Sequence, residues 1–285
     1  MMTKVFVLAV LVVMEVFFAD AANVTIDFDS YVSPTSNQLS DQFYQSSGYG
    51  LVGDFYHQNP TSGIIGGSVT SYAGDEYRAT AVYQNAFLDF SQVGAKTSLT
   101  LDLFFNGQIH PLVDGATGVR SFNLGLINGS MGAFESQESS VYVQGVYSIP
   151  SAEIILVARN INDGSMTSIG LTQAPLALNT WYQIEVTFLN AGNSNVEWDI
   201  ALSNKGATGM DAANVVTSAQ WNWENANITD SSKLSVGFSA LADGGVEKAD
   251  NLKMTNMTNL VPEPSALSLL AVGLGVVLRR RRRTV

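Results

Sequence analysis

The sequence contains no cysteine among its 285 residues and only two histidines, His57 and His110. The lack of cysteine excludes disulfides, a cysteine nucleophile and a cysteine-ligated zinc site. Two histidines outside any recognisable motif offer little material for a histidine-based triad or metal cluster. Stability must therefore come from a core, and a chain of this length with 46% hydrophobic residues can bury a sizeable one.

Charged residues are also scarce, at 14%, and basic residues are the rarer kind in the body of the chain. Between Ala22 and Pro264 the sequence has 8 basic and 23 acidic residues, a net charge of −15. The overall charge of −11 hides this imbalance, because Lys4 and a run of arginines lie near the two ends. An acidic body repels phosphate groups, so we expect no nucleic-acid partner.

The first 21 residues have the pattern of a signal peptide. Lys4 precedes an apolar run at residues 5–18, and Ala19-Asp20-Ala21 has the small-x-small pattern that signal peptidase requires. We therefore predict a signal peptide at residues 1–21, cleaved after Ala21. Glu15 weakens the apolar run, and an uncleaved membrane anchor or a buried core helix are the alternative interpretations.

The C-terminal segment combines three features in a fixed order. Val261, Pro262, Glu263 and Pro264 come first, an apolar segment follows at residues 265–278, and the last feature is the cluster Arg279, Arg280, Arg281, Arg282 and Arg283. This order resembles the PEP-CTERM sorting signal of Gram-negative and related bacteria. The resemblance implies export by the general secretory route, transient retention in the inner membrane, and an exosortase as partner. That enzyme would act near Pro-Glu-Pro, and the protein would then reach the cell surface or the extracellular space.

The physical character of this segment agrees with the resemblance. The two prolines disfavour helix and keep Glu263 on an extended backbone, so residues 259–264 are predicted to be a linker. Residues 265–278 are predicted to form a transmembrane helix, and residues 279–285 a basic cytoplasmic tail. The 14 apolar residues would span about 21 Å as a helix, less than a hydrocarbon core of about 30 Å. Such a weak anchor suits a segment that is later removed.

Between the two ends, apolar and polar residues alternate with a period of two, which is typical of strands with one buried face. The clearest examples are residues 181–188 and 196–202, separated by a turn that contains Gly192 and several asparagines. These two segments predict a hairpin with Ile184 and Ile200 inside and with Glu185 and Asp199 outside. In residues 98–105 the same pattern places the leucines inward and Asp102 outward.

Further strands are predicted at residues 23–30, 121–127, 141–147, 153–160, 233–240 and 251–255, with Asn-Gly and Asp-Gly turns among them. About ten to fourteen short strands with one buried face predict an all-β fold, a two-sheet antiparallel sandwich. We expect this sandwich to occupy residues 22–258.

The order of the later strands narrows the fold. Residues 181–188 begin with Trp-Tyr, a hairpin follows, and a strand containing Asp250-Asn251 closes the domain. This pattern resembles the concanavalin-like jelly roll of lectins, laminin-G modules and glucanases. A β-helix or an immunoglobulin-type sandwich is the alternative, although no internal repeat of fixed period supports the former.

The same resemblance raises the question of catalysis. Glucanases of this fold carry Glu-x-Asp-x-x-Glu on one strand, which holds two carboxylates about 5 to 5.5 Å apart. Here Glu197 and Asp199 are present, but Leu202 takes the place of the second glutamate. We therefore predict no enzymatic activity, and a solvated strand face is the simpler interpretation of the two carboxylates.

Two sets of residues are candidates for ligand binding. Trp221 and Trp223 would share a face if extended, and paired indoles suit stacking on sugar rings, although tryptophans so placed also commonly fill a sandwich core. Asp27 and Asp29 near the start and Asp250 near the end are a possible calcium site if the first and last strands are neighbours. Surface acidity explains these three carboxylates equally well.

The leading hypothesis is an exported, non-catalytic protein at the cell surface or in the extracellular matrix that associates with polysaccharide. One alternative is a divergent extracellular glycoside hydrolase of the same fold. Another is a purely structural or adhesion protein with no small ligand.

Overall fold

The computed structural model describes residues 22–28, 43–46, 54–57, 69–72, 80–83, 86–109, 118–128, 139–162, 165–224, 226–230, 233–240 and 244–259. The predicted signal peptide, membrane segment and arginine tail lie outside these residues. The strands are β1 (Ala22–Ile26), β2 (Phe43–Ser46), β3 (Asp54–His57), β4 (Val69–Tyr72), β5 (Thr80–Tyr83), β6 (Ala86–Phe87), β7 (Lys96–Ile109), β8 (Gly118–Asn128), β9 (Ser140–Ser148), β10 (Glu153–Asn162), β11 (Ser165–Pro175), β12 (Thr180–Gly192), β13 (Asn195–Asn204), β14 (Asn214–Trp223), β15 (Leu234–Ala240) and β16 (Gly244–Asn259).

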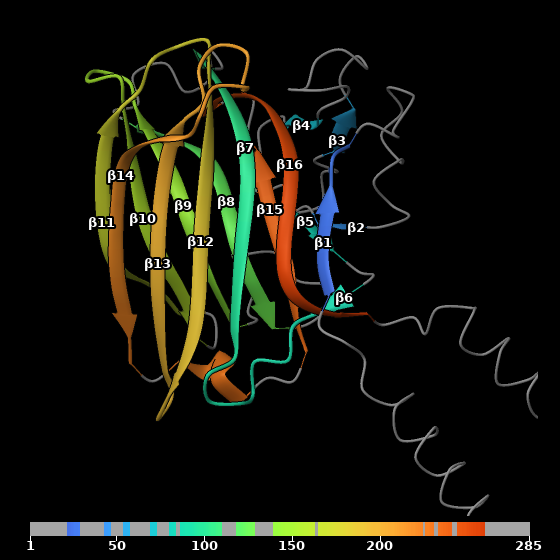
Figure 1. Cartoon of the computed structure of the whole chain (residues 1–285). Helices are drawn as coiled ribbons and strands as arrows, with labels where there is room; N and C mark the ends of the chain where they lie inside the picture. Colours follow the sequence, from blue (N-terminus) through green and yellow to red (C-terminus); the bar gives the residue numbers. More distant parts are fainter. Residues whose placement is uncertain are drawn as a thin grey trace, which may run out of the picture.

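These strands form two antiparallel sheets that pack face to face (Figure 1). The nine-stranded sheet has the order β14-β13-β12-β7-β16-β4-β3, with β1 and β6 also paired to β16, and the seven-stranded sheet has the order β11-β10-β9-β8-β15-β5-β2. One 3-10 helix, η3 (Asn227–Asp230), lies between β14 and β15, and the described residues contain no α-helix. The prediction of an all-β, two-sheet antiparallel sandwich is confirmed.

In the part of the chain that the structure describes, no helix is long and apolar enough to cross a bilayer. The predicted transmembrane helix at residues 265–278 lies beyond the last described residue.

The core forms between the sheets because each long strand turns its apolar positions inward. In β7 the side chains of Leu99, Leu101 and Leu103 are 0% exposed, and in β12 and β13 those of Ile184 and Ile200 are at most 2% exposed. The predicted hairpin is thus confirmed. Its turn contains three residues with positive φ, namely Gly192, Asn193 and Ser194.

The structure also contains strands that the alternation did not predict. β8, β9, β10 and β15 coincide with predicted strands, and β16 extends well beyond the predicted 251–255. The short strands β2, β3, β4, β5 and β6 were missed, and so were β11 and β14, each of which lies at the edge of its sheet. An edge strand buries fewer side chains, and the periodic signal is weaker as a result.

The first and last strands of the sandwich are neighbours, as the calcium hypothesis requires. β1 pairs with β16 from Ala22 opposite Met257 to Ile26 opposite Leu252. Asn259, predicted to begin the linker, is instead the last residue of β16 and pairs with Ala86 of β6. The regular pairing therefore continues to the residue that precedes the sorting segment.

The central hairpin offers a direct test of the register. Replacing Ile184, which is 0% exposed, with aspartate should place an unpaired charge in the core and lower the free energy of unfolding by more than about 4 kcal/mol. The matched change Glu185→Lys on the exposed side of β12 should alter it by less than about 0.5 kcal/mol. Urea unfolding of the full chain measures both, and equal effects would show that the register is wrong.

Candidate functional site

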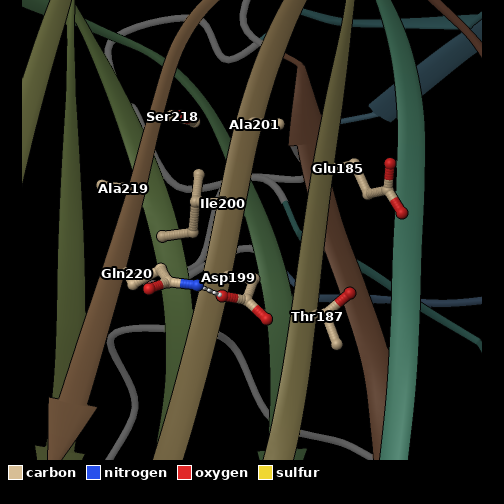
Figure 2. A pocket seen from close by; sticks show the side chains of 8 residues that line it. All are labelled: Glu185, Thr187, Asp199, Ile200, Ala201, Ser218, Ala219 and Gln220. Atoms are coloured by element: carbon tan, nitrogen blue, oxygen red, sulfur yellow. Dashed lines mark hydrogen bonds between the residues drawn. The ribbon is translucent and has the colours of Figure 1, made fainter.

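The outer face of the nine-stranded sheet contains an open groove of about 520 Å³ over β12, β13 and β14 (Figure 2). The side chains that line it belong mainly to outward positions of these strands. They are Glu185, Thr187, Asp199, Ala201, Ser218 and Gln220, together with Ile200 and Ala219. The groove is therefore formed mainly by outward-facing residues, which alternate along each strand with the inward-facing residues of the core.

The register of the strands arranges the lining residues in two rows across the sheet. In the first row, Glu185 lies opposite Ala201, and Ala201 lies opposite Ser218. The small side chains of Ala201 and Ser218 leave space beside the longer Glu185. This difference in size accounts for a hollow on the face of a regular sheet.

The second row contains one internal hydrogen bond and one to the neighbouring strand β7. Thr187 lies opposite Asp199, which lies opposite Gln220. Gln220 Nε2 donates to Asp199 Oδ1 at 2.7 Å, and the hydroxyl groups of Ser98 and Thr187 are 2.6 Å apart. Figure 2 shows Asp199 and Gln220 reaching toward each other between β13 and β14, while Glu185 and Thr187 extend on the β7 side. The row is thus held in place by its own contacts.

One of the two carboxylates of the incomplete glucanase pattern lines the groove. Glu197 and Asp199 are both exposed on the outer face, whereas Leu202 is 0% exposed and lies in the core. Of the two carboxylates, only Asp199 lines the groove, and the second carboxylate there is Glu185, from the neighbouring strand. The alternation predicted that Glu185 and Asp199 both point outward, but it could not show that they line one groove, because that depends on the register between the strands.

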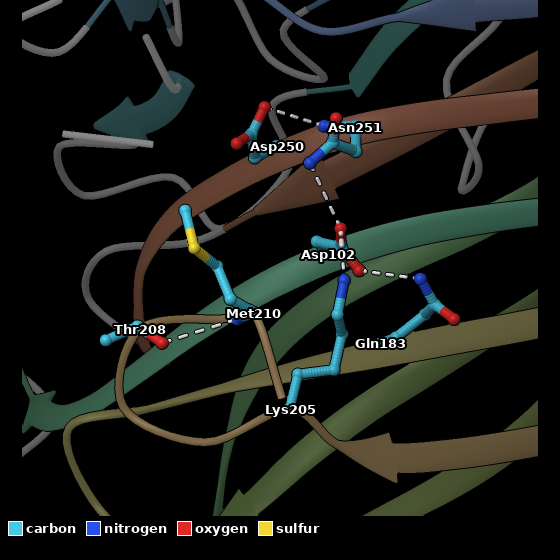
Figure 3. Close-up of polar contacts among 7 residues, drawn as sticks. All are labelled: Asp102, Gln183, Lys205, Thr208, Met210, Asp250 and Asn251. Carbon is cyan, nitrogen blue, oxygen red and sulfur yellow. Dashed lines mark hydrogen bonds and ion pairs between the residues drawn. The ribbon is translucent and has the colours of Figure 1, made fainter. Parts of the chain in front are cut away.

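Beside the groove, the same face contains a buried acidic side chain. Asp102 of β7 is 1% exposed, although its position in the alternation is outward. Its Oδ1 accepts a hydrogen bond from Gln183 Nε2 at 2.9 Å, and its Oδ2 accepts from Asn251 Nδ2 at 3.1 Å and from Lys205 Nζ at 3.2 Å (Figure 3). Three donors therefore satisfy this carboxylate, which is the condition for burying a charge.

The donors reach Asp102 from separate elements. Asn251 has a φ of 51° in an irregular part of β16 between Asp250 and Lys253, where the backbone departs from the ladder with β7. Lys205 follows β13, and its backbone N–H donates to the carbonyl of Trp181 at 2.9 Å. Asp102 thereby connects β7, β12, β16 and the turn after β13.

The predicted stacking residues Trp221 and Trp223 share one face, as expected, but that face is the inner one. Trp223 is 6% exposed in the core, and Trp221 is half-buried against it. A Cβ atom added to Gly170 of β11 would lie 2.5 Å from the indole nitrogen of Trp221, so the ring covers this glycine. The indoles occupy the interior between the edge strands β14 and β11, and Trp223 offers no free ring face to a sugar.

The predicted calcium ligands are only partly described. Asp250 is 0% exposed, Asp27 is exposed just after β1, and Asp29 lies outside the described residues. Asp250 Oδ1 accepts a hydrogen bond from the backbone N–H of Asn251 at 2.8 Å. Among the residues that the structure describes, no group of three or more acidic or histidine side chains could hold a metal ion. A calcium site that includes Asp29 stays a prediction.

Of the two histidines, only His57 is among the described residues. His57 is the last residue of β3, opposite Val69 of β4, and His110 lies outside the described residues.

Comparison with protein families gives a match at the C-terminal segment. Residues 260–283 match the model of the PEP-CTERM protein-sorting motif. The chain carries a PEP-CTERM sorting signal. The PEP-CTERM motif implies export and membrane-associated processing, as the resemblance in Val261–Pro264 and the arginine cluster predicted. No curated protein matches the chain.

Solved structures with a similar arrangement include lectins and a carbohydrate-binding module. The chain is 9% identical to peanut lectin, with 84% of this chain and 100% of the lectin covered and a TM-score of 0.49. A winged bean acidic lectin gives 9% identity, the same two coverages and a TM-score of 0.45. The carbohydrate-binding module CBM66 from Bacillus subtilis gives 9% identity, coverages of 74% and 93%, and a TM-score of 0.34.

The ion pair between Lys205 and the buried carboxylate of Asp102 can be tested by its effect on stability. Replacing Lys205 with methionine keeps much of the aliphatic stem but removes the cation, and breaking a buried ion pair costs about 3 kcal/mol. The matched change Lys253→Met, at an exposed lysine on the same face, should cost less than about 0.5 kcal/mol. Urea unfolding of the two full-length variants compares them. Equal stabilities would mean that Lys205 does not hold Asp102.

Proposed function

We propose that the chain is an exported, non-catalytic protein that associates with polysaccharide at the cell surface or in the extracellular matrix. In this proposal an exosortase processes the PEP-CTERM signal at the inner membrane. The sandwich then binds glycan through the groove over β12, β13 and β14. The observation that carries the proposal is the pair of polar rows that line this groove.

The chemistry of the lining suits the hydroxyl groups of a sugar. The carboxylates of Glu185 and Asp199 accept hydrogen bonds, the hydroxyl groups of Thr187 and Ser218 both donate and accept, and Gln220 provides an amide. All five side chains project from paired strands, so little ordering is needed when a ligand binds.

The charge of the groove restricts the class of glycan. Glu185 and Asp199 are the charged residues of its lining, and both are acidic. The body of the chain between Ala22 and Pro264, these two residues included, has a net charge of −15. A polymer rich in uronate or sulfate groups would be repelled. The preferred ligand is therefore a neutral polysaccharide or one that carries amino sugars.

A glycoside hydrolase is the second candidate, because two carboxylates line one groove. Hydrolysis requires one carboxyl group to protonate the leaving oxygen and a second to act as nucleophile or base. Asp199 already accepts a hydrogen bond from Gln220, which holds it in a fixed position on β13. We favour binding, because no second glutamate follows Asp199 on its strand.

A glycan array probed with the full chain in detergent tests the proposal, and a reducing-sugar assay on the bound polysaccharides tests the hydrolase. We expect binding to neutral or amino-sugar glycans without release of reducing ends. Asp199→Asn removes a charged acceptor, which contributes about 1.5 to 3 kcal/mol to binding, so affinity should fall about ten-fold or more.

The matched control is Glu197→Gln, which neutralises an exposed carboxylate on the same strand outside the groove lining. Its affinity should equal that of the unchanged chain. An equal loss in both variants would point to general charge rather than the groove. Release of reducing ends that Asp199→Asn abolishes would establish the hydrolase, and an array without any binding would favour a structural or adhesion protein.

A further inference from the structure

Both ends of the sandwich emerge at one pole. Ala22 begins β1 and lies opposite Met257, close to the end of β16 at Asn259. Figure 1 shows the start of β1 beside the end of β16, next to β6. The predicted signal peptide precedes Ala22, and the matched sorting motif begins at residue 260.

The register of the other strands shows which parts share this pole. Lys96, the first residue of β7, pairs with Leu189 near the end of β12, and β16 runs antiparallel to β7. The turn between β12 and β13 and the turn at residues 91–94 therefore lie at the same pole as the end of β16. Val93 of the latter turn contacts the position of Gly192, where an added Cβ would lie 3.4 Å from its methyl groups.

The spacing between the fold and the sorting motif is short. Asn259 pairs with Ala86 as part of the fold, and Glu263 lies four residues further along the chain. Four residues reach at most about 14 Å when extended. The headgroup layer on each side of a bilayer is itself about 6 Å thick. While the anchor is in the membrane, the end of β16 is thus confined to the membrane surface.

We infer that this pole, defined as the start of β1, the end of β16, β6 and the turns at 91–94 and 192–195, faces the lipid headgroups in the membrane-anchored form. The long strands then stand away from the membrane, and the opposite pole, which contains Met210 in the turn after β13, is distal. This orientation follows from the path of the chain and the position of the sorting motif, and it does not depend on glycan binding.

The orientation also places the groove. Thr187 and Glu185 lie five and seven residues before Gly192 along β12, which corresponds to about 17 to 23 Å from the pole at about 3.3 Å per residue. The groove therefore faces sideways, clear of the membrane, and the cross-strand rows run parallel to the membrane surface. A polymer could occupy it before the anchor is removed.

Single cysteines can test the orientation cleanly, since the chain has none of its own. The variants are Val93→Cys at the proposed pole, Leu171→Cys on β11 and Met210→Cys at the distal pole, all at side chains that are at least 64% exposed. Each protein starts at Ala22, so that the predicted signal peptide cannot act as a second anchor at this pole. It is labelled with bimane and reconstituted into vesicles of equimolar phosphatidylethanolamine and phosphatidylglycerol. Quenching by a lipid with a nitroxide on its headgroup, which acts at near contact, is then measured.

We expect several-fold stronger quenching at Val93→Cys than at the other two positions. Equal quenching at all three positions, or the strongest at Met210→Cys, would overturn the inference. A flexible Gly-Ser linker inserted between Asn259 and Leu260 should abolish the difference, whereas the same insertion between Ala207 and Thr208 should preserve it. Strong quenching at Val93→Cys that persists with the inserted linker would also overturn the inference. The short connection between Asn259 and the anchor would then not be what keeps this pole at the membrane.

Discussion

The pairing of β7 along both of its edges, with β12 on one side and β16 on the other, is the constraint on which the outer face depends. Thr100 of β7 lies opposite Glu185 across one edge and opposite Lys253 across the other. Because side chains alternate between faces, a slip of β7 by one residue would expose its core leucines and bury its own outward residues, such as Thr100. Core packing thus fixes the groove, and the buried Asp102 reinforces the same junction through donors from three other elements.

The sequence predicted the structure correctly wherever a single strand alternates clearly between apolar and polar residues. Residues 181–188 and 196–202 alternate strongly because both strands lie inside the nine-stranded sheet, and their hairpin was predicted with the correct inward positions. β14 lacks that contrast because it is an edge strand, so Trp221 and Trp223 could be read from sequence either as a binding pair or as core. Contacts between distant strands carry no local signal. The burial of Asp102 depends on Asn251 and Lys205, and the groove depends on a register that no single segment specifies.

The sorting signal and the sandwich have roles at different stages, the first during export and processing and the second after export. The PEP-CTERM motif implies export and membrane-associated processing. We propose that the groove then binds polysaccharide once the domain is exported. The two are linked by geometry, because β16 is both a partner of β7 and the strand that leads directly into the motif. In the membrane-anchored form that we infer, so short a connection turns the sheet faces sideways, which would leave the groove accessible both before and after the anchor is removed.

Carboxyl footprinting by mass spectrometry, with and without the best glycan from the array, tests the central claim that the outer-face groove binds polysaccharide. A water-soluble carbodiimide modifies accessible carboxylates, and Glu185, Glu197 and Asp199 are all exposed on this face. The account predicts that the glycan protects Glu185 and Asp199 while the modification of Glu197 is unchanged. Binding without protection of Glu185 and Asp199 would contradict the account, because the polysaccharide would then occupy another surface.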